Sequence, residues 1–381
     1  MHFYKITLTP VGSFFFGGEQ TFDNGSSQSY LAHSNRYPQQ TTLLGMIRYQ
    51  LLKYHNLLPL SETNTDKAAE IIGKESFCMS VNEKQSFGHI KAISPVFIQN
   101  NNNEPLLPTP FSHGMELSFD EKNSPQLYLN GQIKNAIPEC LAFDSKVYST
   151  TGTLIASNQE TKDLVKYSDI FLSTSQIGIT KADNLDDDKK GFYKQESFRF
   201  KESGTCFAFY LALDEDLDQG DKKENKMDEF VFIGAQRSCF KMLVEKLPDD
   251  TPCSDKTGCS LPFIPEHPQG SVLIVSPTYV TDINKLNKCC RFHWSLSMPF
   301  RNFIQDDKGT LKSGSISYRR HSALCTFLAP GSVLFYEQDK KDTLLSLLKK
   351  DFTMLNRKDA LLSLLKNDNL HAIGYNYFHV N

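Results

Sequence analysis

The stretch from Phe14 to Leu52, FFFGGEQTFDNGSSQSYLAHSNRYPQQTTLLGMIRYQLL, decides how the chain begins to fold. Its three phenylalanines run into Gly17 and Gly18. This order predicts a buried strand end that opens into backbone with positive φ, or into backbone that another chain approaches closely. Before it, residues 3–9 alternate as a strand does. After it, the loop at 23–35 is rich in Ser, Asn, Gln and Gly.

A short amphipathic helix is expected at 41–53, directly after Tyr37-Pro38. Its apolar residues recur at spacings of three and four, which predicts one face packed on a sheet. Thr41 or Thr42 is expected to cap it. Gly45 stands in the first turns, where glycine costs about 1 kcal/mol relative to alanine. Tight helix-to-sheet packing and close approach of a ligand backbone are both open as reasons for this glycine.

Further along the chain the pattern is rich in strands. A second helix is expected at 66–72, ended by Gly73. The segment 205–213, TCFAFYLAL, is apolar on both faces and is therefore expected to be central in its sheet. Short strands are also expected at 90–98, 115–119, 126–130, 230–233 and 240–244, and a helix is expected at about 160–172.

Residues 176–200, QIGITKADNLDDDKKGFYKQESFRF, predict a projecting hairpin. Two strand-like arms, 176–180 and 192–200, flank a charged middle at 186–190. A buried connection does not accommodate five consecutive charges, so this tip is expected to project from a sheet.

The C-terminal part predicts a second round of strands and helices. Strand-like segments lie at 271–277, 291–294, 323–328 and 333–336, with a turn at 329–332. Two helices share the hexapeptide Leu-Leu-Ser-Leu-Leu-Lys, starting at Leu344 and Leu361. Residues 372–376 are expected to form a last strand that carries Gly374.

Length and composition indicate a folded protein with two cores. The chain has 381 residues, of which 39% are hydrophobic, and no apolar run approaches 18 residues. The start MHFYKITLTP lacks the features of a signal peptide, so we expect a cytoplasmic protein. The nine cysteines show no regular framework, which favours reduced thiols.

The charge is unevenly distributed. The formal net charge is −3, but residues 214–229 hold eight acidic and three basic side chains, a net of −5. Residues 285–325 hold eight Lys or Arg and two Asp, a net of +6. Because a polyanion responds to local charge, the basic segment is a candidate nucleic-acid contact, and the alternative is a solvated face.

No established catalytic or cofactor motif is present, and we expect no cofactor. The sequence lacks GxxxxGK[ST], GxGxxG before a helix, H-E-x-x-H and G-x-S-x-G. Neither Cys253, Cys259 and His267 nor Cys289-Cys290 with His293 has the paired spacing of a zinc site. We therefore expect no metal.

Several short motifs, in a fixed order, resemble the RAMP proteins of CRISPR effector complexes, and in particular the subunit 3 family of the type III-B (Cmr) complex. The aromatic-Gly-Gly segment, Tyr37-Pro38 and 41–48 resemble the family's opening. Gly178-Ile179, Lys189-Lys190 and Gly191-Phe192-Tyr193 resemble its hairpin, with lysine where the family has arginine. Gly234-Ala235-Gln236-Arg237 resembles its glycine-turn-arginine step, and Pro330-Gly331-Ser332 and Gly374 resemble its later turns.

The resemblance and the order of elements imply an α+β fold with two ferredoxin-like (RRM-like) units and an inserted projecting β-hairpin at about 176–200. The units would span 1–213 and 214–381. The implied function is a non-catalytic subunit that binds the 5′ handle of the crRNA. Its implied protein partners are the large polymerase-like subunit and the backbone RAMP subunit, with target RNA reached only indirectly and no membrane involved.

Three alternatives stay open beside this interpretation. One is a guide-processing endoribonuclease with His33, His293 or His321 as general acid or base. Another is the equivalent handle-binding subunit of a type III-A complex, and the third is a scaffold without RNA contact.

An RNA-binding subunit needs cations for phosphates, glycine turns that expose N–H groups, and aromatic rings for base stacking. The candidate RNA-binding residues are Gly17, Gly18, Arg36, Tyr37, Thr41, Thr42, Gly45, Arg48, Gly178, Ile179, Lys189, Lys190, Tyr193, Arg237, Arg301, Arg319, Arg320, Gly331, Ser332, Gly374 and Tyr375.

Overall fold

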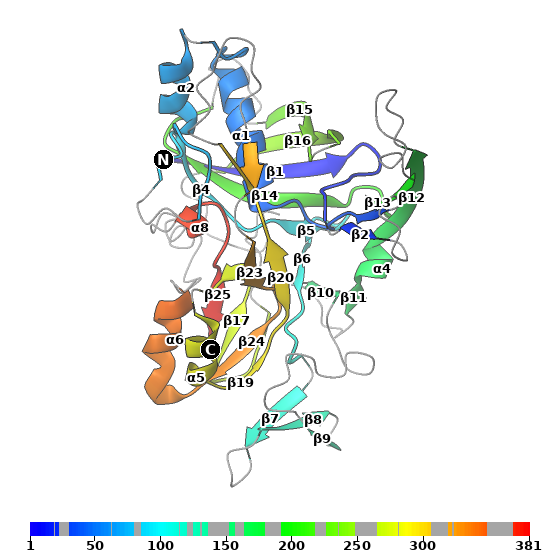
Figure 1. Cartoon of the computed structure of the whole chain (residues 1–381), viewed down its shortest axis with the longest axis vertical. Coiled ribbons are helices and arrows are strands. Elements are labelled where there is room, and N and C mark those ends of the chain that lie inside the picture. The colour runs from blue at the N-terminus through cyan, green and yellow to red at the C-terminus, as the bar shows by residue number, and fades with distance from the viewer. Residues whose placement is uncertain are drawn as a thin grey trace.

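The fold was analysed in a computed structural model of the chain (Figure 1). The structure describes residues 1–18, 20–22, 30–61, 63–79, 85–113, 115–119, 125–129, 132–135, 152–156, 164–179, 192–217, 226–234, 236–247, 265–280, 282–305, 319–321, 324–348 and 369–381.

A large, mostly antiparallel sheet is the centre of the first half. β1 (His2–Pro10) lies between β14 (Cys206–Leu213) and β16 (Ser238–Lys246), antiparallel to both. Every residue of β14 is buried, which confirms the prediction of a central strand. The other strands are β4 (Ile90–Ile93) beside β14, β15 (Lys226–Ile233) outside β16, and, toward the opposite edge, β5 (Phe97–Gln99), β6 (Pro105–Pro108), β10 (Thr153–Ala156) and β11 (Val165–Lys166).

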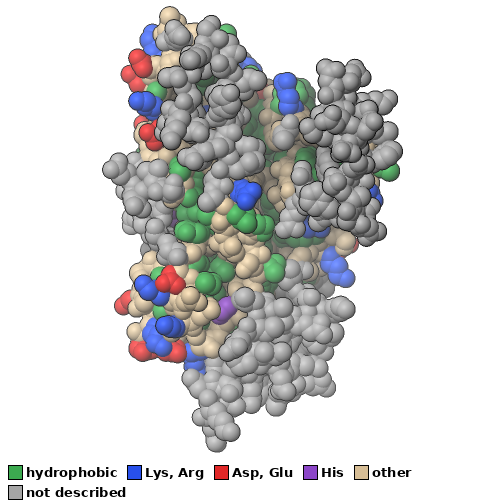
Figure 2. Space-filling view, viewed as in Figure 1, with side chains coloured by type: hydrophobic (Ala, Val, Ile, Leu, Met, Phe, Trp, Pro, Cys, Tyr) green, Lys and Arg blue, Asp and Glu red, His purple; other side chains and the backbone are tan. Residues whose placement is uncertain are grey.

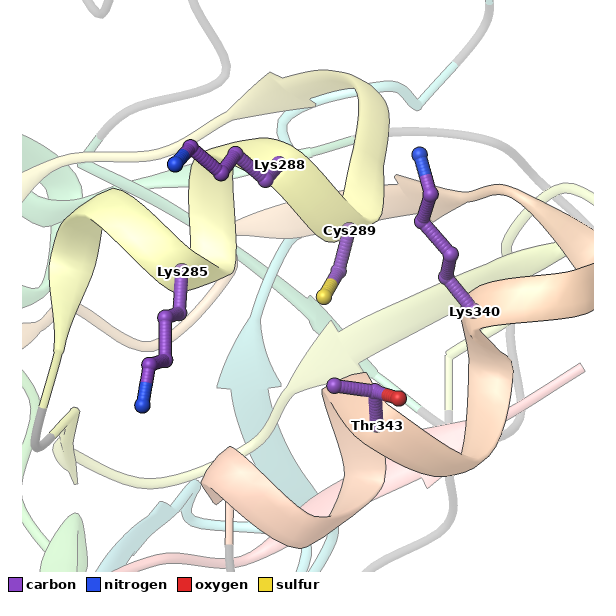
Figure 3. A pocket seen from close by; sticks show the side chains of 5 residues that line it. All are labelled: Lys285, Lys288, Cys289, Lys340 and Thr343. Atoms are coloured by element: carbon purple, nitrogen blue, oxygen red, sulfur yellow. The ribbon is translucent and has the colours of Figure 1, made fainter.

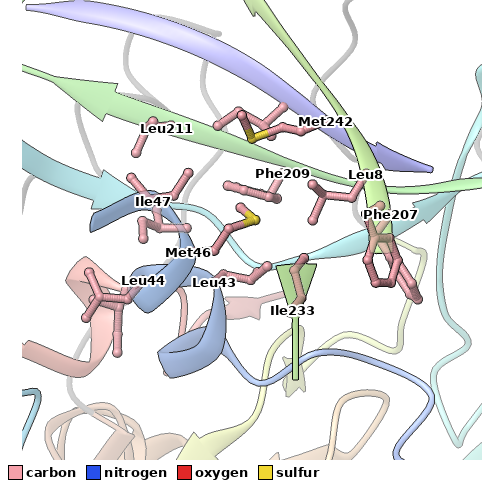
Figure 4. Packing of buried hydrophobic residues seen from close by; sticks show 14 of the residues in the cluster. Leu8, Leu43, Leu44, Met46, Ile47, Phe207, Phe209, Leu211, Ile233 and Met242 are labelled. Carbon is pink, nitrogen blue, oxygen red and sulfur yellow. The ribbon is translucent and has the colours of Figure 1, made fainter. Parts of the chain in front are cut away.

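Helix α1 (Gln40–Tyr54) covers one face of this sheet, as the spacing of its apolar residues predicts. Leu43, Met46 and Ile47 point toward side chains of β1, β14 and β16 (Figure 4). The prediction that Thr41 or Thr42 caps the helix was wrong. The N-cap residue is Gln39, and its side chain makes no capping hydrogen bond. Helix α2 (Thr65–Ile72) ends at Gly73, which confirms that prediction.

The predicted hairpin is part of a separate four-stranded sheet. Its arms are β12 (Phe171–Ile179) and β13 (Phe192–Phe200), paired along their whole length. β13 also pairs in parallel with β3 (Tyr30–His33), which continues to β2 (Gln20–Phe22). The expected tip at 186–190 lies outside the described residues.

The helix expected at 160–172 is present only as α4 (Tyr167–Ile170) within the described residues, because β12 already begins at Phe171. This early start lets Phe171 join an aromatic cluster with Phe14, Phe198, Phe200 and Phe207. The cluster packs the hairpin sheet onto the large sheet.

A second four-stranded sheet lies in the C-terminal half (Figure 1). It is entirely antiparallel, and α5 (Ile283–Cys289) and α6 (Lys341–Leu348) are the helices that connect its strands. Its order is β19 (Cys290–Trp294), β24 (Val333–Tyr336), β17 (Ser271–Ile274) and β25 (Phe378–Val380).

The expected last strand was misplaced. Ala372 is the last residue of α8 (Asn369–Ala372), and the residues that follow it form a turn. Gly374 in this turn has a φ of +95°, which is outside the range of a β-strand. Of the two leucine-rich helices, the one starting near Leu344 is confirmed as α6, and the one starting at Leu361 lies outside the described residues.

Three smaller sheets are also present among the described residues. They contain β18 (Thr278–Tyr279), β23 (Cys325–Leu328) and β20 (Ser297–Phe300); β21 (Phe303–Gln305) and β22 (Arg319–His321); and β7 (Met115–Phe119), β8 (Pro125–Leu129) and β9 (Gln132–Asn135). The short 3₁₀ helix η2 (Gln338–Lys340) precedes α6. The expected α+β class, with few helices and mostly antiparallel sheets, is confirmed. No helix in the described ranges is long and apolar enough to cross a membrane.

Candidate functional site

The loop at Gly17 is held by residues from two separate parts of the chain, 34–35 and 238. The Phe15 N–H donates to Ser238 Oγ at 2.9 Å, and the Phe16 N–H donates to Ser34 Oγ at 3.0 Å. The Asn35 N–H donates to the carbonyl of Gly17 at 3.0 Å. These bonds fix the loop between β3 and the start of β16.

The two adjacent glycines have different roles. A Cβ on Gly18 would lie 2.3 Å from the carbonyl oxygen of His33, so Gly18 is required for backbone packing. Gly17 has a φ of +73°, and a Cβ there would meet no atom within 4 Å. The positive φ favours glycine, and the open space leaves the Gly17 backbone accessible to a ligand.

The turn between β15 and β16 adjoins this loop. A Cβ on Gly234 would lie 2.5 Å from the carbonyl oxygen of Phe15. Gln236 and Gln195 exchange side-chain hydrogen bonds, one of them 3.0 Å long, which ties the turn to β13. The guanidinium of Arg237 is exposed and lies 5.2 Å from the ring centroid of Phe232. The turn thus carries a cation beside the Gly17 loop.

Gly178 and Tyr193 are direct cross-strand partners in the hairpin. A Cβ on Gly178 would lie 2.2 Å from Cζ of Tyr193, so the ring lies over the glycine. This packing explains why a glycine on one arm accompanies a tyrosine on the other.

Arg36 stands between the hairpin sheet and α1. Its side chain is exposed, and its guanidinium lies 5.1 Å from the ring centroid of Tyr167 and 5.2 Å from that of Phe198. Two aromatic faces therefore position this cation at the surface. Together, Gly17, Arg36, Tyr193 and Arg237 form what we call the hairpin surface.

The first turns of α1 follow this surface along the chain. Thr41 and Thr42 are half-buried, and Gly45 is exposed. A Cβ on Gly45 would meet no atom within 4 Å, so tight packing on the sheet does not explain this glycine. Close approach of a ligand backbone is the explanation that stays open.

Arg48, farther along α1, contacts the protein itself. Its Nη2 donates to the carbonyl of Glu75 at 2.9 Å, and its guanidinium lies 5.7 Å from the ring centroid of Phe87. Burial lowers its pKa to about 10. Arg48 therefore tethers the segment after α2 to α1.

Tyr375 lies inside the protein, and Tyr37 is partly buried. The ring of Tyr37 packs against Tyr167 and Phe207, and burial raises its pKa well above the ordinary value. Tyr375 is 2% exposed and packs against Phe300 and Phe327. Base stacking on Tyr375 therefore has no support in this geometry, and base stacking on Tyr37 stays a prediction.

Three further candidates in the second half also face inward. A Cβ on Gly331 would lie 2.7 Å from the carbonyl oxygen of Thr109, and one on Gly374 would overlap the side-chain amide of Gln40. Ser332 is fully buried, and its hydroxyl donates to the carbonyl of Ala329 at 2.7 Å.

The remaining candidates are placed only partly. Arg301 is exposed just after β20. Lys189 and Lys190 lie outside the described residues. Ile179, Arg319 and Arg320 belong to described strands, but their side chains are not described. The structure therefore leaves the RNA contacts expected of these residues as predictions.

One polar array beside Arg36 is not evident from the sequence. His33 Nδ1 lies 2.6 Å from Glu196 Oε2, and the hydroxyl of Ser173 donates to the other carboxylate oxygen. Hydrogen bonds from Ser173 and His33 lower the pKa of Glu196. The parallel register that sets Glu196 opposite His33 joins residues 163 positions apart, a pairing that local sequence patterns do not reveal.

A second cationic feature lies in the C-terminal half, between α5 and α6. Lys285, Lys288, Lys340, Thr343 and Cys289 line an open groove of about 520 Å³. The Cys289 sulfur points into it, whereas the three lysines point outward in different directions (Figure 3). Side chains of both charge signs gather in this part of the surface (Figure 2). The groove therefore lacks the converging cations of an anion site.

Metal-ligating residues do not gather in the part of the chain that the structure describes. No group of three or more His, Cys, Asp or Glu side chains is arranged there as ligands of one ion. Cys206, Cys239, Cys289 and Cys290 are free thiols. Cys253 and Cys259 lie outside the described residues.

Comparison with protein families identifies the chain. The family described as CRISPR-associated protein (Cas_Cmr3) matches residues 6–378, which is nearly the whole sequence. The chain belongs to the CRISPR-associated Cmr3 family. It is therefore a Cmr3-type subunit of a type III-B complex, and the resemblance inferred from its short motifs is confirmed. No curated protein matches the chain.

Proposed function

We propose that this Cmr3-family protein is a non-catalytic, cytoplasmic RAMP subunit that binds the 5′ handle of the crRNA in the type III-B effector. The hairpin β12–β13 separates the handle from the guide, and the hairpin surface contacts the handle backbone. The protein contacts RNA shape and unpaired bases, while the guide reads the target sequence by base pairing.

One observation supports this proposal above the others. The parallel pairing of β3 with β13 joins the opening stretch to the hairpin in a single sheet. This sheet carries the ring of Tyr193, and the segment after β3 holds Gly17 and Arg36 against it. The hydrogen bonds between Gln236 and Gln195 attach the turn that carries Arg237. Accessible backbone, cations and an aromatic ring are the three kinds of group that bind single-stranded RNA.

The two ferredoxin-like units also belong to this proposal. In each half, the first and second strands run in the same direction, with helical chain between them in the sequence. The third strand lies between these two strands and is antiparallel to both. The fourth strand lies on the far side of the first. The orders β4-β14-β1-β16 and β19-β24-β17-β25 fit that topology. The division at 213/214 is refined by the pairing of β16 with β1, which favours a first unit that extends to Lys246.

Docking of the large polymerase-like subunit and of the backbone RAMP subunit completes the proposed role. Membership of the Cmr3 family makes the chain one subunit of a multi-subunit complex. The exposed residues of α6 are one candidate contact for these partners, since only its Leu344 and Leu348 are buried.

The test is RNA affinity across a salt series, with the chain alone and in the assembled complex, using guide RNA with and without the handle. We expect handle-dependent binding of intact RNA and a log-log salt slope of about −0.7 per phosphate contact. Binding that ignores the handle or the salt concentration in the assembled complex would contradict the proposal.

A guide-processing ribonuclease is the second candidate, and the His33 array favours it specifically. The Glu196 carboxylate orients the His33 ring, whose side chain is 42% exposed, as a general acid or base requires. In that case His33→Ala would abolish cleavage and spare RNA affinity. In the handle-binding proposal, the wild-type protein leaves the RNA intact, and the same variant changes affinity only modestly.

A further inference from the structure

The outermost strand of the large sheet exposes an unusual pair of side chains. Phe230 and Phe232 of β15 are 63% and 57% exposed, whereas Val231 and Ile233, which alternate with them, are 2% exposed. Two large aromatic side chains thus point away from the core on one face of the sheet. Exposed apolar groups gathered in this way mark interaction surfaces.

The same face of the sheet is covered elsewhere by the chain itself. Over β14, Ala208 and Tyr210 are fully buried in a cluster that includes Tyr377 of the second half. The cross-strand register places Phe230 opposite Lys241 and Lys241 opposite Thr9. Phe230 and Phe232 therefore lie on the same face of the sheet as Ala208 and Tyr210. The second half therefore covers β14 and leaves β15 open.

Among the described residues, the backbone of β15 also has an unpaired edge. β15 ends the strand order of its sheet, and in the described ranges it pairs only with β16 (Figure 1). An edge strand presents unpaired N–H and C=O groups that hydrogen-bond to an added strand.

Charge around the edge does not favour a polyanion. Asp228 pairs with Lys241 at 2.8 Å, and Glu229 pairs with Lys53 at 2.8 Å. Arg237 lies over the ring of Phe232 at the turn end of the strand, where it belongs to the hairpin surface, so the rest of the edge carries no unpaired charge among residues 228–233. A nearly neutral edge with two exposed aromatic rings suits a protein strand better than a phosphate backbone.

We infer that β15 is the docking edge for another protein subunit of the complex, which adds an extended strand there. The added strand places apolar side chains at alternate positions over Phe230 and Phe232, because this spacing matches the period of a strand. The inference rests on the docking role proposed above and names the surface that performs it.

The test compares the double variant Phe230→Ala/Phe232→Ala with Tyr49→Ala in complexes assembled from the full-length subunits. Tyr49 is a matched control, since it is 56% exposed but lies on α1. We expect the double variant to bind its neighbouring subunits at least about tenfold more weakly, as loss of aromatic anchors does, and the control to bind normally. Hydrogen exchange at 226–233 is expected to slow in the wild-type complex and to remain fast in the isolated chain.

Several outcomes would overturn the inference. Unchanged assembly of the double variant would exclude this edge, and failure of the wild-type chain to assemble would refute the docking role itself. A loss of RNA affinity in the isolated double variant that exceeds the loss in Arg237→Ala, with normal assembly, would make RNA the occupant. Protection of β15 by dimerisation of the isolated chain would make a second copy the occupant. Both variants should unfold at the wild-type temperature, because the replaced side chains are exposed.

Discussion

The two four-stranded arrangements, β4-β14-β1-β16 and β19-β24-β17-β25, share one order but present their glycines differently. In the first half, a Cβ on Gly17 or Gly45 would enter open space. In the second half, a Cβ on Gly331 or Gly374 would collide with atoms of the first half. The difference teaches that glycines of one sequence motif family can leave the backbone accessible, as at Gly17 and Gly45, or allow close packing between the two halves, as at Gly331 and Gly374.

This contrast assigns different tasks to the two halves. The turn at Gly331 packs on Thr109 and Phe111, and the turn at Gly374 packs on Gln40 and Ser94, so both join the second half to the first. The hairpin sheet attaches to the first half and leaves Arg36 and Arg237 exposed. In the proposed function, the first half therefore offers the RNA surface, and the second half braces it.

The largest effect is expected for Gly374→Ala. The new Cβ would overlap the Gln40 amide and lie 2.7 Å from the Ser94 carbonyl oxygen, at a φ of +95°. Overpacking and strain together should lower the free energy of unfolding by about 4 kcal/mol, measured by urea denaturation. Gly270→Ala is the control, because its φ is +72° but its Cβ would meet no atom within 4 Å. Equal costs for both variants would contradict the packing role.

The second largest effect is expected from acid, which should lower the free energy of unfolding through protonation of His267 in the second half. Its Nδ1 lies 2.8 Å from Ser271 Oγ and its Nε2 lies 2.9 Å from Nδ1 of His379. Burial and the neighbouring His379 lower its pKa to about 4. At pH values between the ordinary pKa of histidine and this lowered pKa, His267 is protonated in the unfolded chain but neutral in the folded protein. The free energy of unfolding therefore falls as the pH falls through this range. We expect a loss of about 2 kcal/mol from pH 7 to pH 5.

The matched measurement uses His267→Gln, whose side chain does not titrate. Its unfolding free energy should depend less steeply on pH over the same range, even if the variant is less stable at pH 7. Identical pH profiles for the variant and the wild type would show that His267 does not carry the effect.

Local patterns predicted the elements well and the contacts between them poorly. The period of 3.6 located α1, and the run TCFAFYLAL identified β14 as central, because both depend on neighbouring residues. The inward positions of Tyr375 and Gly374 were not predictable from local patterns. The ring of Tyr375 packs against Phe300 and Phe327, 75 and 48 residues before it, and Gly374 meets Gln40 and Ser94, 334 and 280 residues before it. The pairing of His33 with Glu196 likewise depends on the register of a parallel strand pair.

Arg36 and Arg48 allow a sharper comparison between an exposed and a tethered cation. Arg36→Ala should weaken handle binding about tenfold and reduce the salt slope by about 0.7, because one phosphate contact is lost. Arg48→Ala should mainly lower stability, because it removes the hydrogen bond to the Glu75 carbonyl. Filter binding and thermal unfolding of both variants measure the two effects. The reverse assignment would move the RNA surface from the hairpin to the outer face of α1.

Gly45→Ala is expected to have the smallest effect on stability, and it should raise the free energy of unfolding, whereas the variants above lower it. Because a Cβ at this exposed helical position meets no atom within 4 Å, alanine should stabilise α1 by up to about 1 kcal/mol. If a ligand backbone approaches Gly45, the same methyl group should weaken handle binding in the assembled complex. Greater stability together with weaker binding would place RNA against the first turns of α1. Greater stability with unchanged binding would confine the RNA contact to the hairpin surface, and the glycine would then have no role in binding.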